Sequence, residues 1–207
     1  MSQSNQPFNV YQLHIVLRRT SPHLWRRVLV RSDSTLRHLH QTLQALFGWS
    51  DAHPHRFVLR GRLLAASPAA AVSALPSTDV SLAGLQLQLN EKFFYDYRFH
   101  DPDTPVWHHQ LRLEKILVAG RDAYPTCLGG AGSPPLEETH SPRELADLTE
   151  LFTPQFVLHR LTGLIDQQVP DAQLAQELRH LRPWLTADRF RRPSTERQLR
   201  AMPGGTR

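Results

Sequence analysis

The chain has 207 residues, of which 40% are hydrophobic, so it is long enough to bury a core in one domain. Its one cysteine excludes an internal disulfide, no apolar run approaches the roughly 20 residues that span a bilayer, and residues 1–6 lack the charged and apolar parts of a signal peptide. These features predict a cytoplasmic protein that has no membrane association.

Residues 10–62 predict a strand, a second strand, a helix and a third strand, in that order. Residues 10–17 and 25–30 alternate apolar and polar side chains as half-buried strands do, and Ser-Pro-His interrupts the run between them. Capping oxygens at residues 32–34 and Gly48 mark the ends of the helix. Its apolar positions recur at helical spacing: Leu36, Leu39, Leu43, Leu46 and Phe47. Residues 53–59 then resume a strand.

The middle of the chain predicts a loop followed by a hairpin. Residues 65–79 form an Ala/Ser/Pro tract without periodicity, which favours a solvated loop, and residues 80–85 have room for a short helical turn. Residues 92–99 are dense in aromatic side chains and give the strongest strand signal. Residues 107–117 alternate as the partner strand of the hairpin.

The last third of the chain changes from strand to helix. Residues 124–142 are rich in glycine and proline and predict a loop. Residues 142–151, 154–165 and 171–181 each begin with proline or aspartate in a position that suits a first helical turn. Residues 189–207 are rich in arginine and hold too few apolar side chains to pack, which predicts disorder.

The predicted fold class is therefore α+β, a mostly antiparallel sheet with a strand-strand-helix-strand unit, a later hairpin and C-terminal helices. Four segments follow from this division. We expect a flexible N-terminus at residues 1–9, an α+β domain at 10–140, a helical extension at 141–186 and a basic disordered tail at 187–207.

The positive charge is concentrated at the two ends of the chain. Residues 1–62 hold nine arginines and two aspartates (+7), residues 63–178 hold seven basic and fifteen acidic side chains (−8), and residues 179–207 hold eight arginines and two acidic side chains (+6). Either the first segment neutralises the second within one fold, or a basic face and tail bind nucleic acid. The candidate phosphate or partner contacts in the second case are Arg26, Arg27, Arg189, Arg191 and Arg192. Because Arg26 and Arg27 point to opposite faces of a strand, we expect at least one of them to be merely solvated.

Twelve histidines are the most suggestive residues for chemistry. His53 and His55 point to one face if they lie in a strand, and His109 lies near Asp101 across the predicted hairpin turn. Two histidines and a carboxylate can hold zinc or another divalent metal with a position open for water. The alternative is a polar structural cluster, and His40, on the apolar face of the predicted helix, favours a hydrogen-bonded core residue. No HExxH or CxxC motif adds weight to a metal site.

Other features favour structural roles. Cys127 has no base nearby in the sequence, which favours an inert thiol over a nucleophile. The glycines at 129, 130 and 132 lack the lysine and hydroxyl residue of a phosphate-binding loop. The aromatic strand at residues 93–99 suits core packing, with a base-stacking platform as the alternative.

Several phrases of the sequence, taken in order, resemble the plasmid pRiA4b ORF-3-like family, whose members are also described as passenger TnpR-type proteins of insertion elements. The phrases are Leu-Trp-Arg-Arg-Val-Leu-Val at 24–30, Leu-His at 39–40, Gly-Trp at 48–49, His-Pro-His-Arg-Phe at 53–57, Tyr-Asp-Tyr-Arg-Phe at 95–99, Trp-His-His at 107–109 and Tyr-Pro-Thr-Cys-Leu at 124–128. The resemblance covers residues 10–135, implies one α+β domain with an antiparallel sheet, and implies little about activity.

The chain departs from the family pattern at two places. Arg98 and His100 replace the aspartate and glycine of the family's hairpin, and five residues separate Asp101 from Trp107. The family's cysteine-rich loop is reduced to Cys127, so any metal held there in relatives has lost its ligands here. The polar residues that remain are His53, His55, Asp101 and His109, which form the candidate polar or metal cluster.

Three functions stay open from the sequence. The leading hypothesis is a cytoplasmic binding module, linked to mobile elements, that engages a protein or nucleic-acid partner without catalysis and without a cofactor. The alternative is a metal-dependent enzyme that uses the His/Asp cluster. The third is a helical scaffold whose contact stripe is Leu174, Leu178, Leu181 and Leu185.

Overall fold

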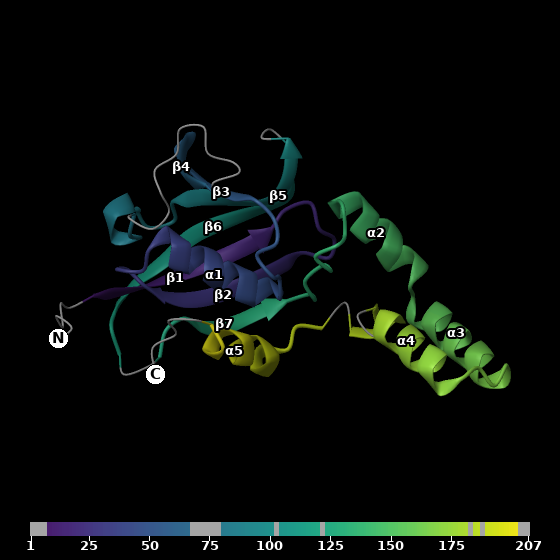
Figure 1. The fold of residues 1–207 in the computed structure, drawn as a ribbon. Coiled ribbons are helices and arrows are strands. Elements are labelled where there is room, and N and C mark those ends of the chain that lie inside the picture. The colour runs from purple at the N-terminus through teal and green to yellow at the C-terminus, as the bar shows by residue number, and fades with distance from the viewer. Residues whose placement is uncertain are drawn as a thin grey trace.

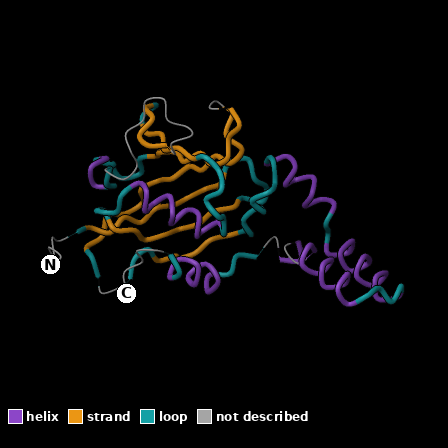
Figure 2. The backbone as a smooth tube through the Cα atoms, viewed as in Figure 1, coloured by secondary structure: helices purple, strands orange, loops and turns teal. Residues whose placement is uncertain are grey.

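The structure is a computed structural model that describes residues 8–66, 80–101, 104–120, 123–181, 184–186 and 189–202. The described residues form one antiparallel sheet of seven strands in the order β4-β3-β5-β6-β1-β2-β7 (Figures 1 and 2). The strands are β1 (Asn9–Leu17), β2 (Leu24–Arg31), β3 (His55–Leu59), β4 (Arg62–Ala66), β5 (Lys92–Asp101), β6 (Thr104–Val118) and β7 (Thr126–Ala131). The α+β prediction is confirmed.

The helices are α1 (Leu36–Phe47), α2 (Pro142–Leu151), α3 (Pro154–Asp166), α4 (Asp171–Leu181) and α5 (Arg192–Arg200), with short 3₁₀ turns at Ala83–Leu85 and Trp184–Thr186. None of these described helices is both long enough and apolar enough to cross a membrane. Helices α2, α3 and α4 lie at the residues predicted for them and extend away from the sheet as an arm (Figure 1).

Helix α1 covers one face of the sheet and encloses the main core. The helix begins at Thr35, whose side-chain oxygen accepts from the His38 N–H at 3.2 Å, and ends at Gly48, whose φ of 67° suits a residue without a Cβ. Large side chains from β1, β5 and β6 fill the space beneath it, among them Ile15, Tyr95 and Trp107, each with an exposed fraction of 0%. On the other face, alternate residues of the same strands are mostly half-buried, because no described helix covers them.

Three elements differ from the sequence prediction. Strand β4 pairs with β3 and includes residues 65 and 66, which the sequence assigned to the loop at 65–79. Residues 67–79 of that predicted loop lie outside the described part. Strand β7 pairs with β2 in a segment that also predicted a loop. The predicted disordered tail is wrong for Arg192–Arg200, which form α5 and pack against β7 and α1. Of the predicted flexible N-terminus, residues 1–7 lie outside the described part.

The glycine at position 130 of β7 is required by its neighbour Arg26. A Cβ on Gly130 would lie 2.8 Å from both the Cδ atom of Arg26 and the carbonyl oxygen of Trp25. The Arg26 guanidinium lies beside the end of β7 and donates to the carbonyls of Ala131 and Gly132 at 2.8 and 2.9 Å. Glycine therefore serves close packing here, although it is a weak strand former.

Candidate functional site

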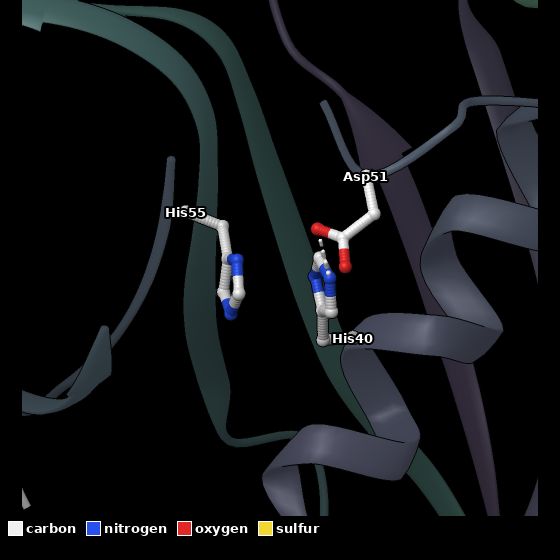
Figure 3. Close-up of side chains that lie close together, drawn as sticks. All are labelled: His40, Asp51 and His55. Carbon is white, nitrogen blue, oxygen red and sulfur yellow. Dashed lines mark hydrogen bonds and ion pairs between the residues drawn. The ribbon is translucent and has the colours of Figure 1, made fainter. Parts of the chain in front are cut away.

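Two histidines and one aspartate from three segments meet on the side of the sheet that α1 covers (Figure 3). His40 lies on α1, Asp51 lies in the loop that follows the helix, and His55 is the first residue of β3. One ring nitrogen or carboxylate oxygen from each lies within 4.8 Å of the others. The helical spacing that buries Leu36, Leu43 and Phe47 also directs His40 to this position.

A closed ring of four hydrogen bonds holds His40 and Asp51 together. The Asp51 N–H donates to Oε1 of Gln44 at 3.0 Å, and Nε2 of Gln44 donates to the Tyr95 hydroxyl oxygen at 2.8 Å. The Tyr95 hydroxyl then donates to Nδ1 of His40 at 2.8 Å, so the proton of neutral His40 lies on Nε2 and is donated to Oδ1 of Asp51 at 2.7 Å. The ring assigns the tautomer of His40 and ties the loop to the helix.

The two imidazoles are stacked and neutral. Their ring centroids are 3.6 Å apart with an interplanar angle of 10°. Burial lowers the pKa of His40 to about 4, with the charge of Arg37 lowering it further. Burial also lowers the pKa of His55 to about 3, an effect strengthened by His40 and opposed by Asp51. At neutral pH each ring therefore has one protonated nitrogen and one nitrogen with a lone pair.

Asp51 lies at the solvent edge of this cluster. Its side chain is 56% exposed, and its φ of 63° is a left-handed conformation that aspartate tolerates better than most residues. Burial raises the pKa of its carboxyl, opposed by His55 and Arg37. The nearby Glu137 adds to this rise and accepts from the Ser50 N–H at 2.9 Å.

The cluster predicted from the sequence is only partly brought together. His55 joins His40 and Asp51, while His53 packs edge-on against Tyr97 at 5.8 Å. His109 lies on β6, which β5 separates from β3. Tyr95 of β5 lies between the two histidines, with its ring centroid 5.9 Å from that of His55 and 5.3 Å from that of His109. His109 is fully buried, which lowers its pKa to about 3, and its Nδ1 bonds the Tyr95 carbonyl at 3.2 Å. The side chain of Asp101 lies outside the described part.

Sequence reasoning missed the pairing of His40 with Asp51. The sequence predicts a hydrogen-bonded core residue at His40, and its bonds to Tyr95 and Asp51 agree with that prediction. The available signal was the spacing, because Asp51 follows the helix end by four residues and precedes His55 by four.

A second histidine–aspartate pair lies on the uncovered face of the sheet. Asp96 accepts from Nε of Arg56 at 2.8 Å and bonds Nδ1 of His108. Burial raises the pKa of Asp96, but the hydrogen bonds from His108 and Arg56 outweigh it, so the pKa lies below its usual value. Phe94, on the same face, stacks on His108 with centroids 5.0 Å apart.

Neither of the arginines predicted on β2 is available for phosphate. Arg26 is 1% exposed and burial lowers its pKa to about 10, while its guanidinium donates to the backbone of β7. Arg27 shares a face with Trp25, as predicted, and pairs with Glu114 at 2.6 Å.

The arginines at the C-terminal end instead line a broad hollow of about 840 Å³ at the start of α5. We call it the arginine hollow; it is lined by Arg189, Phe190, Arg191, Arg192, Pro193, Ser194 and Arg197. Within the part of the chain that the structure describes, its arginines form no ion pair with a carboxylate.

The apolar stripe proposed for a helical scaffold is divided. Leu181 is 2% exposed and packs with Val157 and Trp184 in a small core of the arm, whereas Leu178 and Leu185 are 43% and 45% exposed. Of the predicted stripe, Leu181 therefore packs inside the arm and is not available to a partner.

Comparisons with known proteins agree with the fold. The sequence pattern of the family described as "Plasmid pRiA4b ORF-3-like protein" matches residues 9–156, which extends into α3 and beyond the resemblance noted above. "Uncharacterized protein y4hQ" of Sinorhizobium fredii is 28% identical over 136 residues, 65% of this chain and 68% of that protein. The crystal structure of MM3350 from Methanosarcina mazei Go1, titled a protein of unknown function, has a TM-score of 0.67 at 23% identity and covers 90% of this chain and 97% of its own. At that identity the likeness concerns the fold alone.

Proposed function

The chain belongs to the plasmid pRiA4b ORF-3-like family, and we propose that it is a binding module that engages the phosphate backbone of a nucleic acid through the arginine hollow, without catalysis. The observation that carries the proposal is the convergence of Arg189, Arg191, Arg192 and Arg197 on one hollow, with no carboxylate paired to them among the described residues.

Arg192 and Arg197 lie on helix α5, and Arg189 and Arg191 lie in the segment directly before it. Leu199 inserts into the main core with an exposed fraction of 1%, and Oε1 of Glu196 accepts from the Cys127 N–H at 2.5 Å. Phe190 packs against the buried guanidinium of Arg26 at 4.7 Å. Side chains on a docked helix lose less conformational entropy on binding than those of a flexible tail, which favours phosphate capture.

The local charge suits a polyanion. Residues 189–202 contain five arginines and one glutamate, so the segment carries +4. Guanidinium groups pair with phosphate in a bidentate manner, and such contacts read the backbone rather than the bases. We therefore expect binding that is largely independent of base sequence and strongly dependent on salt.

The test is fluorescence anisotropy with a labelled DNA duplex and a labelled single strand, titrated with the full chain at several salt concentrations. The variant replaces Arg189, Arg191 and Arg192 with glutamine. The matched control replaces Arg18, Arg143 and Arg179, which are exposed and lie elsewhere, so both proteins lose the same formal charge. We expect the hollow variant to lose at least about tenfold in affinity and its log–log salt slope to fall by about 3, with a much smaller change in the control.

Equal losses in the two variants would show attraction by net charge alone and would contradict a site at α5. Absence of binding by the wild type at low salt would also contradict the proposal and would favour a protein partner.

A further inference from the structure

We propose that His40, Asp51 and His55 form a binding site for one divalent transition-metal ion, best matched to zinc or ferrous iron. The inference is independent of the arginine hollow. It starts from the convergence of two imidazoles and a carboxylate within 4.8 Å, from three separate segments of the chain. Two imidazole nitrogens and one carboxylate oxygen form a donor set that these ions prefer, and the set leaves coordination positions open for water.

The hydrogen bonds of the cluster favour a cation. The Asp51 carboxylate is bonded to Nε2 of His40 at 2.7 Å, and no guanidinium or ammonium group is hydrogen-bonded to it among the described residues. A divalent cation can therefore reach the carboxylate without displacing a cationic side chain.

The location of Asp51 provides the entry path. Its exposed carboxylate meets solvent first, and His40 and His55 lie behind it with exposed fractions of 3% and 8%. An ion captured by Asp51 therefore needs to shed water only as it reaches the buried rings.

The hydrogen-bond ring supplies the outer support that metal-bound histidines normally have. Nε2 of His40 faces Asp51, so this is the nitrogen that binds the ion, and its proton must then move to Nδ1. Nδ1–H would donate to the Tyr95 hydroxyl, which also accepts from Gln44. Metal binding therefore reverses one hydrogen bond of the ring and changes the tautomer of His40.

The stacking of the rings shows which part must move. An imidazole lone pair lies in the ring plane, so an ion about 2.1 Å from both nitrogens must lie near both planes. Two planes that are nearly parallel and stacked at 3.6 Å do not meet at such a point. Binding of one ion by both rings therefore requires at least one imidazole to rotate out of the stack.

The pair on the other face of the sheet provides a matched comparison. Asp96 and His108 also combine a carboxylate with an imidazole, but the Arg56 guanidinium already pairs with Asp96 at 2.8 Å. A metal ion at that carboxylate would lie next to a permanent positive charge, so we assign no site there.

The test is isothermal titration of the metal-stripped full chain with Zn²⁺, and with Co²⁺ as an absorbing probe, at pH 7. We expect one ion per chain and a Zn²⁺-dependent rise in the unfolding temperature. Asp51→Asn and His55→Gln should each lose at least about 100-fold in affinity, more than the loss of an outer-shell partner costs. The control Asp96→Asn/His108→Gln should bind as the wild type does.

Two further measurements separate a built site from surface adsorption and from misfolding. Asparagine at position 51 tolerates the left-handed backbone and can accept from His40, so unfolding of Asp51→Asn in urea should match the wild type. Nitrogen NMR of His40 should show its proton move from Nε2 to Nδ1 on adding Zn²⁺. Unchanged affinity in Asp51→Asn, an unchanged His40 tautomer, or an equal loss in the control would each overturn the proposal. Nucleic-acid binding measured in a chelator tests the arginine hollow separately.

Discussion

The two faces of the sheet carry the same chemical pair, aspartate with histidine, in opposite electrostatic states. At the edge of the helix-covered face, the exposed Asp51 pairs with the buried neutral His40, and partial desolvation raises the pKa of the carboxyl. On the uncovered face, Asp96 is held by Arg56 and His108, and their hydrogen bonds overcome burial to lower its pKa. The shifts run in opposite directions because two hydrogen-bonded side chains favour the ionised form of Asp96, whereas Asp51 is bonded to the neutral ring of His40.

This difference separates a structural pair from a candidate ligand-binding pair. The charge of Asp96 is compensated by a guanidinium that cannot lose its proton, so its contacts stabilise the sheet. Asp51 has no guanidinium bonded to it among the described residues, and it lies beside the two buried, stacked imidazoles of His40 and His55. An uncompensated carboxylate beside neutral nitrogen donors is typical of a cation site rather than of a fold-stabilising ion pair.

The largest effect that distinguishes the two faces should come from neighbouring aromatic residues on β5. Tyr95 is 0% exposed and lies within the hydrogen-bond ring, whereas Phe94 is half-buried on the uncovered face. We expect Tyr95→Ala to lower the free energy of unfolding by about 4 kcal/mol, because it leaves a cavity and removes partners of His40 and Gln44. Phe94→Ala should cost about 1 kcal/mol. Urea unfolding monitored by circular dichroism measures both, and equal costs would mean that the faces do not differ in packing.

The next effect concerns acid stability. The folded-state pKa values of His40 and His55, about 4 and about 3, lie below the ordinary histidine value, so the unfolded chain binds more protons between these values and pH 6.5. Stability is therefore present above pH 6.5 and is lost as the pH falls. We expect the cluster to contribute a loss of about 2 kcal/mol per histidine between pH 6.5 and 4.5. In His55→Phe, which keeps an aromatic ring against His40, the slope of unfolding free energy with pH should be shallower; an unchanged slope would contradict neutral burial.

Much of the fold follows from patterns local in the sequence. The strand-strand-helix-strand unit, the hairpin and helices α2 to α4 are confirmed near their predicted residues, because alternation, helical spacing and capping residues are short-range signals. Strand β7 was not predicted because the need for glycine at position 130 arises from a contact with Arg26, which lies about a hundred residues away in the sequence. Helix α5 was not predicted because an otherwise polar segment is docked by one buried side chain, Leu199, and by one hydrogen bond that Glu196 accepts from the Cys127 N–H.

The candidate site was harder to predict, because the order of strands decides which histidines meet. The sequence placed His55 and His109 in one cluster, but β5 lies between their strands and inserts Tyr95. His40 and Asp51 reach His55 through the geometry of a helix end and a left-handed loop residue, for which the sequence carries no periodic signal. Register and loop conformation are properties of the folded chain.

The smallest effect is the most direct test of the opposite pKa shifts, because it compares one substitution at two aspartates. Asp96→Asn removes a charge that pairs with Arg56, and we expect it to lower stability by about 1.5 kcal/mol at pH 7. Since the folded-state pKa of Asp96 is lowered, its contribution is present above about pH 4 and is lost as the pH falls through that folded value, so the cost should fade in acid. Asp51→Asn should change stability by no more than about 0.5 kcal/mol at pH 7, because the ionised form of Asp51 is not favoured by folding. Urea unfolding at pH 7 and in acid measures both differences, and a cost for Asp51→Asn as large as that for Asp96→Asn would mean that the protein already balances the charge of Asp51, which would remove the electrostatic argument for a cation at that site.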